Sequence, residues 1–177
     1  MLAPVLVTPP ATAPVSLAEA KDHLRVDHDD EDTLIQAMVD AATEHLDGYD
    51  GTLGRAIMPQ TWAQKYSGFC GDMVLPFGPV QAVTSVAYDA ETFEDYQLLQ
   101  DGRGYFLRVN DGASWPSASG PVTVTFEAGY SSVPSPIKAA ILLHVGTLYE
   151  YRETMVENVK PSPAYEALLA PYRVWIA

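Results

Sequence analysis

The spacing of hydrophobic and polar residues changes twice along the chain, from helical to strand-like and back to helical. After residue 33, hydrophobic side chains recur at helical spacing and polar ones fill the opposite face, which predicts an amphipathic helix of about five turns. The hydrophobic face comprises Leu34, Ile35, Met38, Ala41, Ala42, Leu46 and Tyr49. The polar face comprises Gln36, Asp40, Thr43, Glu44 and Asp47.

A shorter helix is expected before this one, from Ser16 to about Arg25. Ser16 offers a side-chain oxygen as N-cap, and Glu19 stands three residues later, which is the spacing of a capping box. The longer helix then begins inside the acidic run of residues 27–32.

Between residues 61 and 130 the pattern takes on a period of two, which is typical of half-buried strands. Residues 122–128 and 82–88 alternate in this way, and residues 105–109 are rich in strand-forming side chains. Turn-rich segments separate these stretches. We therefore expect a small antiparallel sheet of four to six strands, inserted between helical parts.

The helical pattern returns at Ser135 and Pro136, a serine cap followed by proline at the first helical position. Residues 137–152 are hydrophobic on nearly every side, which predicts a buried central helix. A hinge at residues 153–161 and a short helix at residues 163–169 are expected next. Pro171 ends that helix and leaves an aromatic tail.

These elements predict the α+β class. We expect a helical core of one long amphipathic helix and one buried central helix, an inserted small antiparallel β-region and an extended C-terminal tail. The predicted organisation is one domain with five segments. They are a proline-rich arm at residues 1–15, a first helical part at 16–58, the β-region at 59–132, a second helical part at 133–170 and a C-terminal anchor at 171–177.

Charge and composition exclude several classes of function. The 177 residues include 10 Lys and Arg against 23 Asp and Glu, a net charge of −13. Such a surface repels phosphate, which argues against nucleic-acid binding through a basic groove. Cys70 is the only cysteine, so an internal disulfide and a cysteine-rich zinc site are excluded. We expect a soluble intracellular protein without a secretory leader or membrane span.

The acidic run of residues 27–32 suggests a calcium loop, but its spacing is wrong. The sixth position of such a loop should be glycine and is Asp32, while the twelfth should be glutamate and is Met38. We expect these carboxylates to cap the following helix instead. The four histidines also lack the spacing of a helical metal pair. The sequence thus predicts no metal and no cofactor.

Catalysis is disfavoured because no recognisable catalytic motif is present. Cys70 with His144 could serve as nucleophile and base, which leaves a small hydrolase as an alternative. However, Cys70 lies in a turn with no helix following it to lower its pKa. We expect a protein that is not an enzyme.

Residues 14–27, followed by acidic residues and an amphipathic helix, resemble the opening of the gp6-like head–tail connector family of tailed phages. Further segments agree with that family in the same order: residues 60–62, 75–80, 126–130, 136–143, 148–153 and 168–173. The resemblance spans residues 14–173. It departs at residues 51–55, where a tighter Thr-Gly-Arg turn is expected.

The resemblance implies an adaptor that binds beneath the portal protein of a capsid and extends the DNA channel toward the tail. It implies a homo-oligomeric ring with twelvefold symmetry, located in the neck of the particle and assembled in the bacterial cytoplasm. A head-completion (stopper) or tail protein is the implied partner on the other side. Gene transfer agents use similar adaptors. A stopper or tail-completion protein is the alternative within the neck.

The resemblance also implies that the C-terminal segment contacts the portal. The implied contact residues are Tyr172, Arg173, Val174, Trp175 and Ile176. For the channel or ring surface the candidates are the acidic residues Asp29, Asp30, Asp40 and Glu44. An acidic lumen would let duplex DNA pass without specific binding. A closed ring needs two different patches, for which the amphipathic helix and the β-region are candidates and the proline-rich arm a further one.

Overall fold

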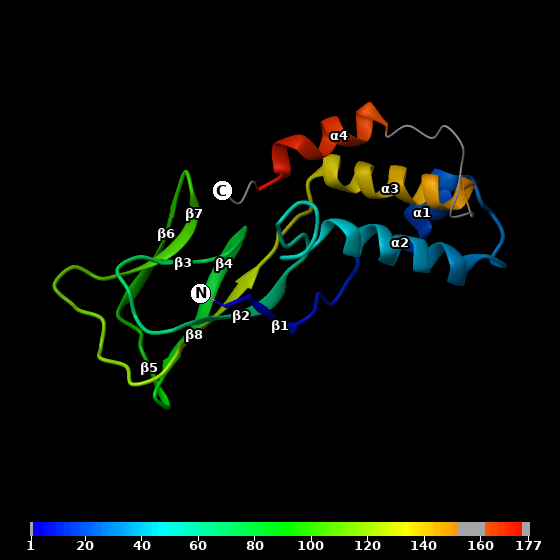
Figure 1. The fold of residues 1–177 in the computed structure, drawn as a ribbon. Coiled ribbons are helices and arrows are strands. Elements are labelled where there is room, and N and C mark those ends of the chain that lie inside the picture. The colour runs from blue at the N-terminus through cyan, green and yellow to red at the C-terminus, as the bar shows by residue number, and fades with distance from the viewer. Residues whose placement is uncertain (1, 152–161, 175–177) are drawn as a thin grey trace. The chain divides into compact units, whose positions relative to one another are not determined.

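The computed structural model describes residues 2–151 and 162–174, which contain both helices and antiparallel sheets (Figure 1). The α+β class expected from the sequence is confirmed. The chain divides into two compact units. Unit 1 comprises residues 1–11 and 58–131, and unit 2 comprises residues 12–57 and 132–177.

Unit 1 contains two antiparallel sheets. The larger has the order β1-β2-β8-β4-β5, and the smaller has the order β3-β7-β6. The strands are β1 (Val5–Thr8), β2 (Gln60–Tyr66), β3 (Met73–Val74), β4 (Val80–Tyr88), β5 (Glu91–Thr92), β6 (Tyr96–Asp101), β7 (Gly104–Val109) and β8 (Val122–Ala128). The expectation of one sheet of four to six strands was wrong, because periodicity marks strands but not which strands pair.

Strand β8 lies at the centre of the larger sheet, between β2 and β4. Its inward residues are buried and alternate with half-buried threonines, as the sequence predicted. Phe126 is fully buried, and its ring lies 5.8 Å from that of Phe77, which in turn lies 4.9 Å from Trp62. This aromatic row forms the core of unit 1.

The alternation expected for residues 82–88 is interrupted in the structure. The pairing of β4 with β8 shifts register between Val80 and Ala82 and again between Val83 and Ser85. Each shift moves the following side chains to the other face of the sheet. Ala82 and Thr84 are consequently exposed, while Val86 is buried.

The proline-rich N-terminal segment is extended, and its residues 5–8 form an edge strand. Strand β1 pairs with β2 through Val5 opposite Ala63 and Leu6 opposite Trp62. The Gln64 side-chain amide also donates to the carbonyl of Leu2 at 2.6 Å. Part of the predicted arm is therefore built into the larger sheet.

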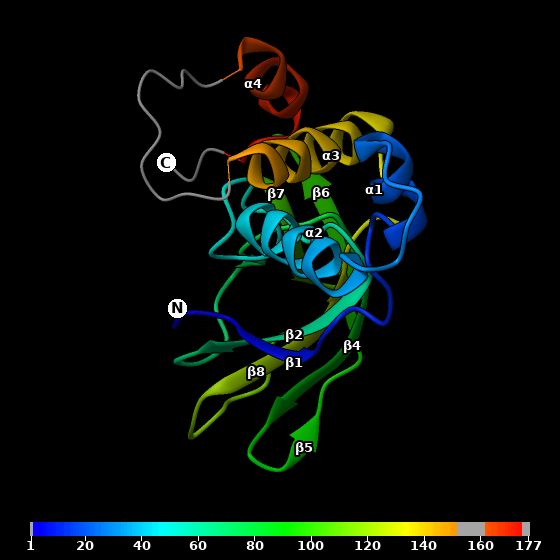
Figure 2. The same cartoon turned by 90° about the vertical axis from the view of Figure 1, so that its right-hand side faces the viewer.

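Unit 2 contains the helices α1 (Leu17–Leu24), α2 (Asp32–Leu46), α3 (Ser135–Glu150) and α4 (Pro163–Leu169), followed by a 3-10 helix at Ala170–Tyr172. Helix α3 packs against α2 on one side and α4 on the other (Figures 1 and 2). Helix α1 contacts both α2 and α3. Among the described residues, no helix has the length and hydropathy to span a membrane.

The capping box predicted for α1 is confirmed. The Glu19 N–H donates to Ser16 Oγ at 3.2 Å, and the Ser16 N–H donates to the Glu19 carboxylate at 2.8 Å. The helix ends at Arg25, whose φ of 59° is left-handed. Sequence and structure agree on both ends of this element within one residue.

Helix α2 buries a narrower stripe than predicted. Its buried residues are Ile35, Val39, Ala42 and Leu46. Leu34 is 40% exposed and Ala41 is exposed, so both were placed wrongly on the buried face. These four residues are spaced four, three and four positions apart, so they lie on one narrow face of the helix. The neighbouring helices cover only that face.

Helix α3 also differs from its prediction. Its N-cap position is Pro134, and Ser135 is the first helical residue with no side-chain cap hydrogen bond at that end. Ile137, Ala140, Ile141 and Val145 are buried, while the remaining hydrophobic positions are half-buried. The helix is hydrophobic on every side but is buried along one face only.

Candidate functional site

The predicted portal-contact residues begin on a segment that is fixed to unit 2. The Val174 N–H donates to the carbonyl of Leu53 at 3.0 Å, and Arg55 Nε donates to the carbonyl of Tyr172. The Arg173 guanidinium forms an ion pair with Glu166 at 2.9 Å. The chain is therefore held by three polar contacts up to Val174. Trp175, Ile176 and Ala177 lie outside the described residues.

The predicted last helix is confirmed, since α4 spans Pro163–Leu169. The α-helix ends before Pro171 as predicted, and a 3-10 helix at Ala170–Tyr172 follows it. Residues 172–174 then contact the loop at Leu53–Arg55. Proline is tolerated at the start of such a helical turn because a backbone N–H at that position would have no partner within the helix.

Sequence reasoning missed the loop that receives the tail. Leu53 and Arg55 supply its two hydrogen bonds, and Gly54 lies between them with a φ of 59°. A Cβ on Gly54 would lie 3.6 Å from Val174, so the glycine also sits directly against the tail. The sequence did carry one indication of this loop, because residues 51–55 depart from the tighter Thr-Gly-Arg turn that the family resemblance leads us to expect.

The acidic candidates lie on α2 and on the loop before it. Asp29 accepts a hydrogen bond from Lys21 at 2.6 Å, and this contact holds the pKa of the Asp29 carboxyl below its usual range. Lys21 also binds Asp32 at 2.6 Å, so the lysine joins α1 to the start of α2. The expected side-chain cap is missing, since the N-cap residue Glu31 makes no such bond, but Asp32 lies in the first turn of α2, where the helix dipole favours a carboxylate.

The other acidic candidates keep their carboxylates on the surface. Asp30, Asp40 and Glu44 are all exposed. Asp40 accepts a hydrogen bond from the Gln36 amide one helical turn earlier, at 2.8 Å. These residues can add negative potential to one side of α2, while the charge of Asp29 is offset by Lys21.

Two histidines meet where α2 packs against α3. The rings of His45 and His144 are 5.2 Å apart and perpendicular, and the His144 ring lies 5.8 Å from that of Tyr165. Burial first, and then the neighbouring His45, lower the pKa of His144. No group of three or more metal-binding side chains exists among the described residues. The pair is therefore a packing contact in unit 2.

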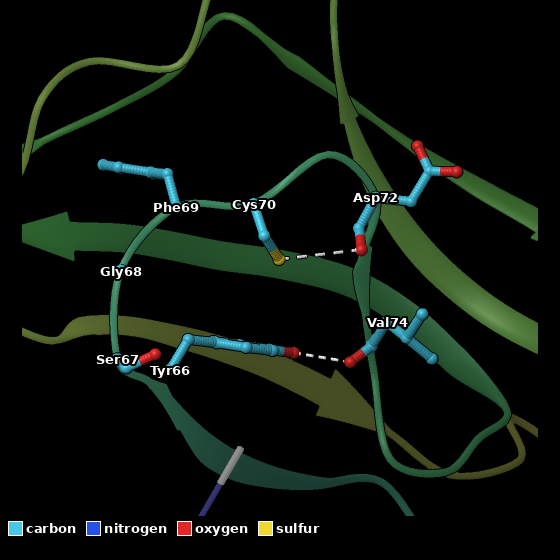
Figure 3. Close-up of a pocket in the computed structure, with 7 residues that line it drawn as sticks. All are labelled: Tyr66, Ser67, Gly68, Phe69, Cys70, Asp72 and Val74. Atoms are coloured by element: carbon cyan, nitrogen blue, oxygen red, sulfur yellow. Dashed lines mark hydrogen bonds between the residues drawn. The ribbon is translucent and has the colours of Figure 1, made fainter.

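An open pocket of about 350 Å³ lies in unit 1 around the turn after β2 (Figure 3). Its lining residues are Tyr66, Ser67, Gly68, Phe69, Cys70, Asp72 and Val74. The Tyr66 hydroxyl donates to the Val74 carbonyl at 2.6 Å, and the Cys70 thiol faces the Asp72 carbonyl at 3.9 Å.

The polar side chains of this pocket are engaged in contacts of their own. Burial raises the pKa of the Tyr66 hydroxyl, so it stays protonated. The Asp72 carboxylate makes a two-pronged pair with Arg108, at 2.8 and 2.7 Å, and this contact lowers its pKa. The lining residues of the pocket include no histidine, and their one carboxylate, Asp72, is held by Arg108.

Comparison with known families gives one match. Residues 14–97 match the model of the phage gp6-like head–tail connector protein family. The resemblance noted in the sequence is confirmed over this part of the chain, which includes α1, α2, strands β2 to β5 and the start of β6. No curated protein sequence matches the chain.

Solved structures with a similar fold come from gene transfer agent (GTA) particles. A chain in the neck of an empty GTA particle, computed with C6 symmetry, is 22% identical, with a TM-score of 0.81 over 99% of this chain and 97% of that one. A chain in the virion of a native GTA particle is 23% identical with a TM-score of 0.80, and one in a native neck computed with C12 symmetry is 21% identical with a TM-score of 0.74. Both cover 99% of this chain and 97% of their own length. At these identities the likeness establishes the fold.

Proposed function

We propose that this protein is a structural connector subunit of a phage or gene transfer agent neck, without catalytic activity. In this role it forms a ring beneath the portal protein and extends the DNA channel toward the tail. The observation that carries the proposal is the agreement of two comparisons. The connector family model matches residues 14–97, and the similar folds that cover nearly the whole chain come from GTA neck and virion structures.

The charge of the chain suits a channel component. At −13 per subunit, a ring of copies would carry a strongly negative potential wherever acidic side chains face the lumen. Duplex DNA would then be repelled from the wall rather than held by counterion release. Asp30, Asp40 and Glu44 are the exposed acidic candidates for such a surface.

The C-terminal residues are the proposed anchor to the portal. Because Tyr172, Arg173 and Val174 are bonded to unit 2, the residues that follow start from a fixed point. Trp175 and Ile176 are the large hydrophobic groups among them, and aromatic side chains are frequent anchors in protein interfaces. Less conformational entropy is lost on docking when the attachment point is already ordered.

A truncation after Val174 tests this proposal, with binding to purified portal rings as the measurement. The cut removes Trp175, Ile176 and Ala177 but keeps the three contacts of the preceding segment, so unit 2 should stay folded. We expect portal binding to weaken at least tenfold. The matched control is Leu34→Ala, which removes an exposed hydrophobic side chain of unit 2 and should bind normally.

One outcome contradicts the C-terminal anchor and another contradicts the adaptor role. If the truncated protein binds the portal as tightly as the full chain, the C-terminal residues are not the anchor. If the full chain binds no portal but binds a tail-side neck component, the protein is a stopper or tail-completion protein instead.

A further inference from the structure

Strand β1 leaves an unusual amount of hydrophobic surface uncovered. Val5 is 60% exposed, Leu6 42% and Val7 55%, so side chains on both faces of the strand are open. With Leu2, these residues are four of the seven large hydrophobic side chains that are exposed in the described part of the chain. Clustered hydrophobic exposure of this kind marks a surface that another molecule covers.

Only one edge of β1 is paired. The strand stands at the end of the larger sheet, beside β2, so its outer edge offers backbone donors and acceptors to which no strand of the described residues bonds (Figure 2). An open edge is a template for a further strand. Pro4 and Pro9 bound β1 on either side and cannot donate to a ladder. Pairing at this edge is thus confined to a short, defined stretch.

Unit 1 has one other edge that suits β1. Strands β3 and β5 have two residues each, and the bulges of β4 break its edge. Strand β6 is different. It ends the smaller sheet, has six residues and pairs with β7 without any register shift. Its outer edge is therefore the longest regular one available among the described strands.

Charge indicates that the occupant of the β1 edge is a second copy of this chain. Copies with a charge of −13 repel each other over most of their surfaces. Residues 2–11 carry no charge, and residues 96–100 of β6 carry none either. The one acidic residue of β6, Asp101, is paired with Arg103 at 3.1 Å. These two edges can meet without opposing carboxylates.

We propose that β1 of one subunit adds to the β6 edge of the next subunit and so joins the two through a continuous sheet. This inference rests on the proposed function, since a cyclic neck ring requires two different patches that meet head to tail. Stable interfaces usually bury about 800 Å² on each partner, far more than a four-residue strand can supply. The pairing therefore forms in the assembled ring and not in the free protein.

Cross-linking in assembled necks tests the pairing. In a Cys70→Ser background, Val7→Cys and Gln100→Cys place one thiol on each proposed edge. A short bismaleimide, which tolerates small differences in register, is added to purified particles. The matched control combines Val7→Cys with Thr84→Cys. Thr84 is exposed on β4, so its thiol is accessible but lies away from the proposed β6 edge.

We expect a ladder of cross-linked multimers from the Val7→Cys/Gln100→Cys protein and none from the control pair. When the two single variants are assembled together, dimers should form, because each link must then join different subunits. Either variant assembled alone should stay monomeric on a denaturing gel.

Several results would overturn the inference. Absence of the ladder from particles whose neck contains the protein refutes the edge pairing but leaves the proposed function intact. Dimers from Val7→Cys alone indicate two β1 strands facing each other, and a ladder from the control pair indicates β4 as the acceptor. If the protein is missing from the neck, the proposed function fails and the pairing fails with it.

A charge on the edge gives a second measurement. Val7→Lys places a cation where two neutral strands should meet, and Val74→Lys is its control on β3, where valine is 48% exposed. We expect Val7→Lys to reduce incorporation into necks at least tenfold while the free protein stays folded. Normal incorporation of Val7→Lys, or an equal loss with Val74→Lys, contradicts the proposal.

Discussion

His144 is a half-buried histidine whose protonation opposes the packing of α3 against α2 and α4. Its Nδ1 atom is buried and has no hydrogen-bond partner among the described residues, and its ring faces His45 and Tyr165. Burial and the nearby His45 lower its pKa from the ordinary value of 6.5. The unfolded chain therefore binds more protons than the folded one as the pH falls through 6.5, so folding loses stability there.

Replacement of this histidine should flatten the pH dependence of stability. We expect the free energy of unfolding of His144→Gln to fall less than that of the original protein between pH 7.5 and 5.5. The difference should be about 1 kcal/mol at most, since solvent screens a half-buried group. Urea unfolding at each pH measures it. The control is His28→Gln, which alters a half-exposed histidine in a loop. If the free energy of unfolding changes equally with pH in His144→Gln and in the original protein, His144 is not the group responsible.

At the scale of secondary structure, the elements with local signals were predictable. Helix α1 carries its capping box in four consecutive residues, and β8 shows its burial pattern directly in its own sequence. The missed features depend on distant residues. Strand β1 pairs with residues more than fifty positions away, and the buried stripe of α2 was misread because its neighbours cover Val39 rather than Ala41.

The two serines at predicted helix starts give a direct test of capping. Ser16 makes the cap bond of α1, whereas Ser135 was expected to cap α3 but makes no such bond. We expect Ser16→Ala to lower the free energy of unfolding by about 1 kcal/mol. Ser135→Ala should change it by less than about 0.5 kcal/mol. Urea denaturation followed by circular dichroism measures both, and equal losses would contradict the assignment of the caps.

At the scale of the whole molecule, the sequence indicated the family resemblance but not the contacts made by the C-terminal segment. The resemblance named Tyr172 to Ile176 as the portal segment, but it could not show that residues 172–174 bond to Leu53, Arg55 and Glu166. Those partners are remote in sequence and carry no motif. Likewise the net charge of −13 suits a channel that does not hold DNA, yet only the fold exposes β1 and β6 as uncharged edges within that acidic surface.

The connector role is decided by an electron cryomicroscopy map of the particle neck, compared between particles with the full chain and particles from a deletion strain. We expect a ring of this protein at the narrow end of the portal, and we expect that ring to be missing from the deletion particles. A map in which the ring is unchanged by the deletion, or in which the protein occupies no part of the neck, would contradict the connector role.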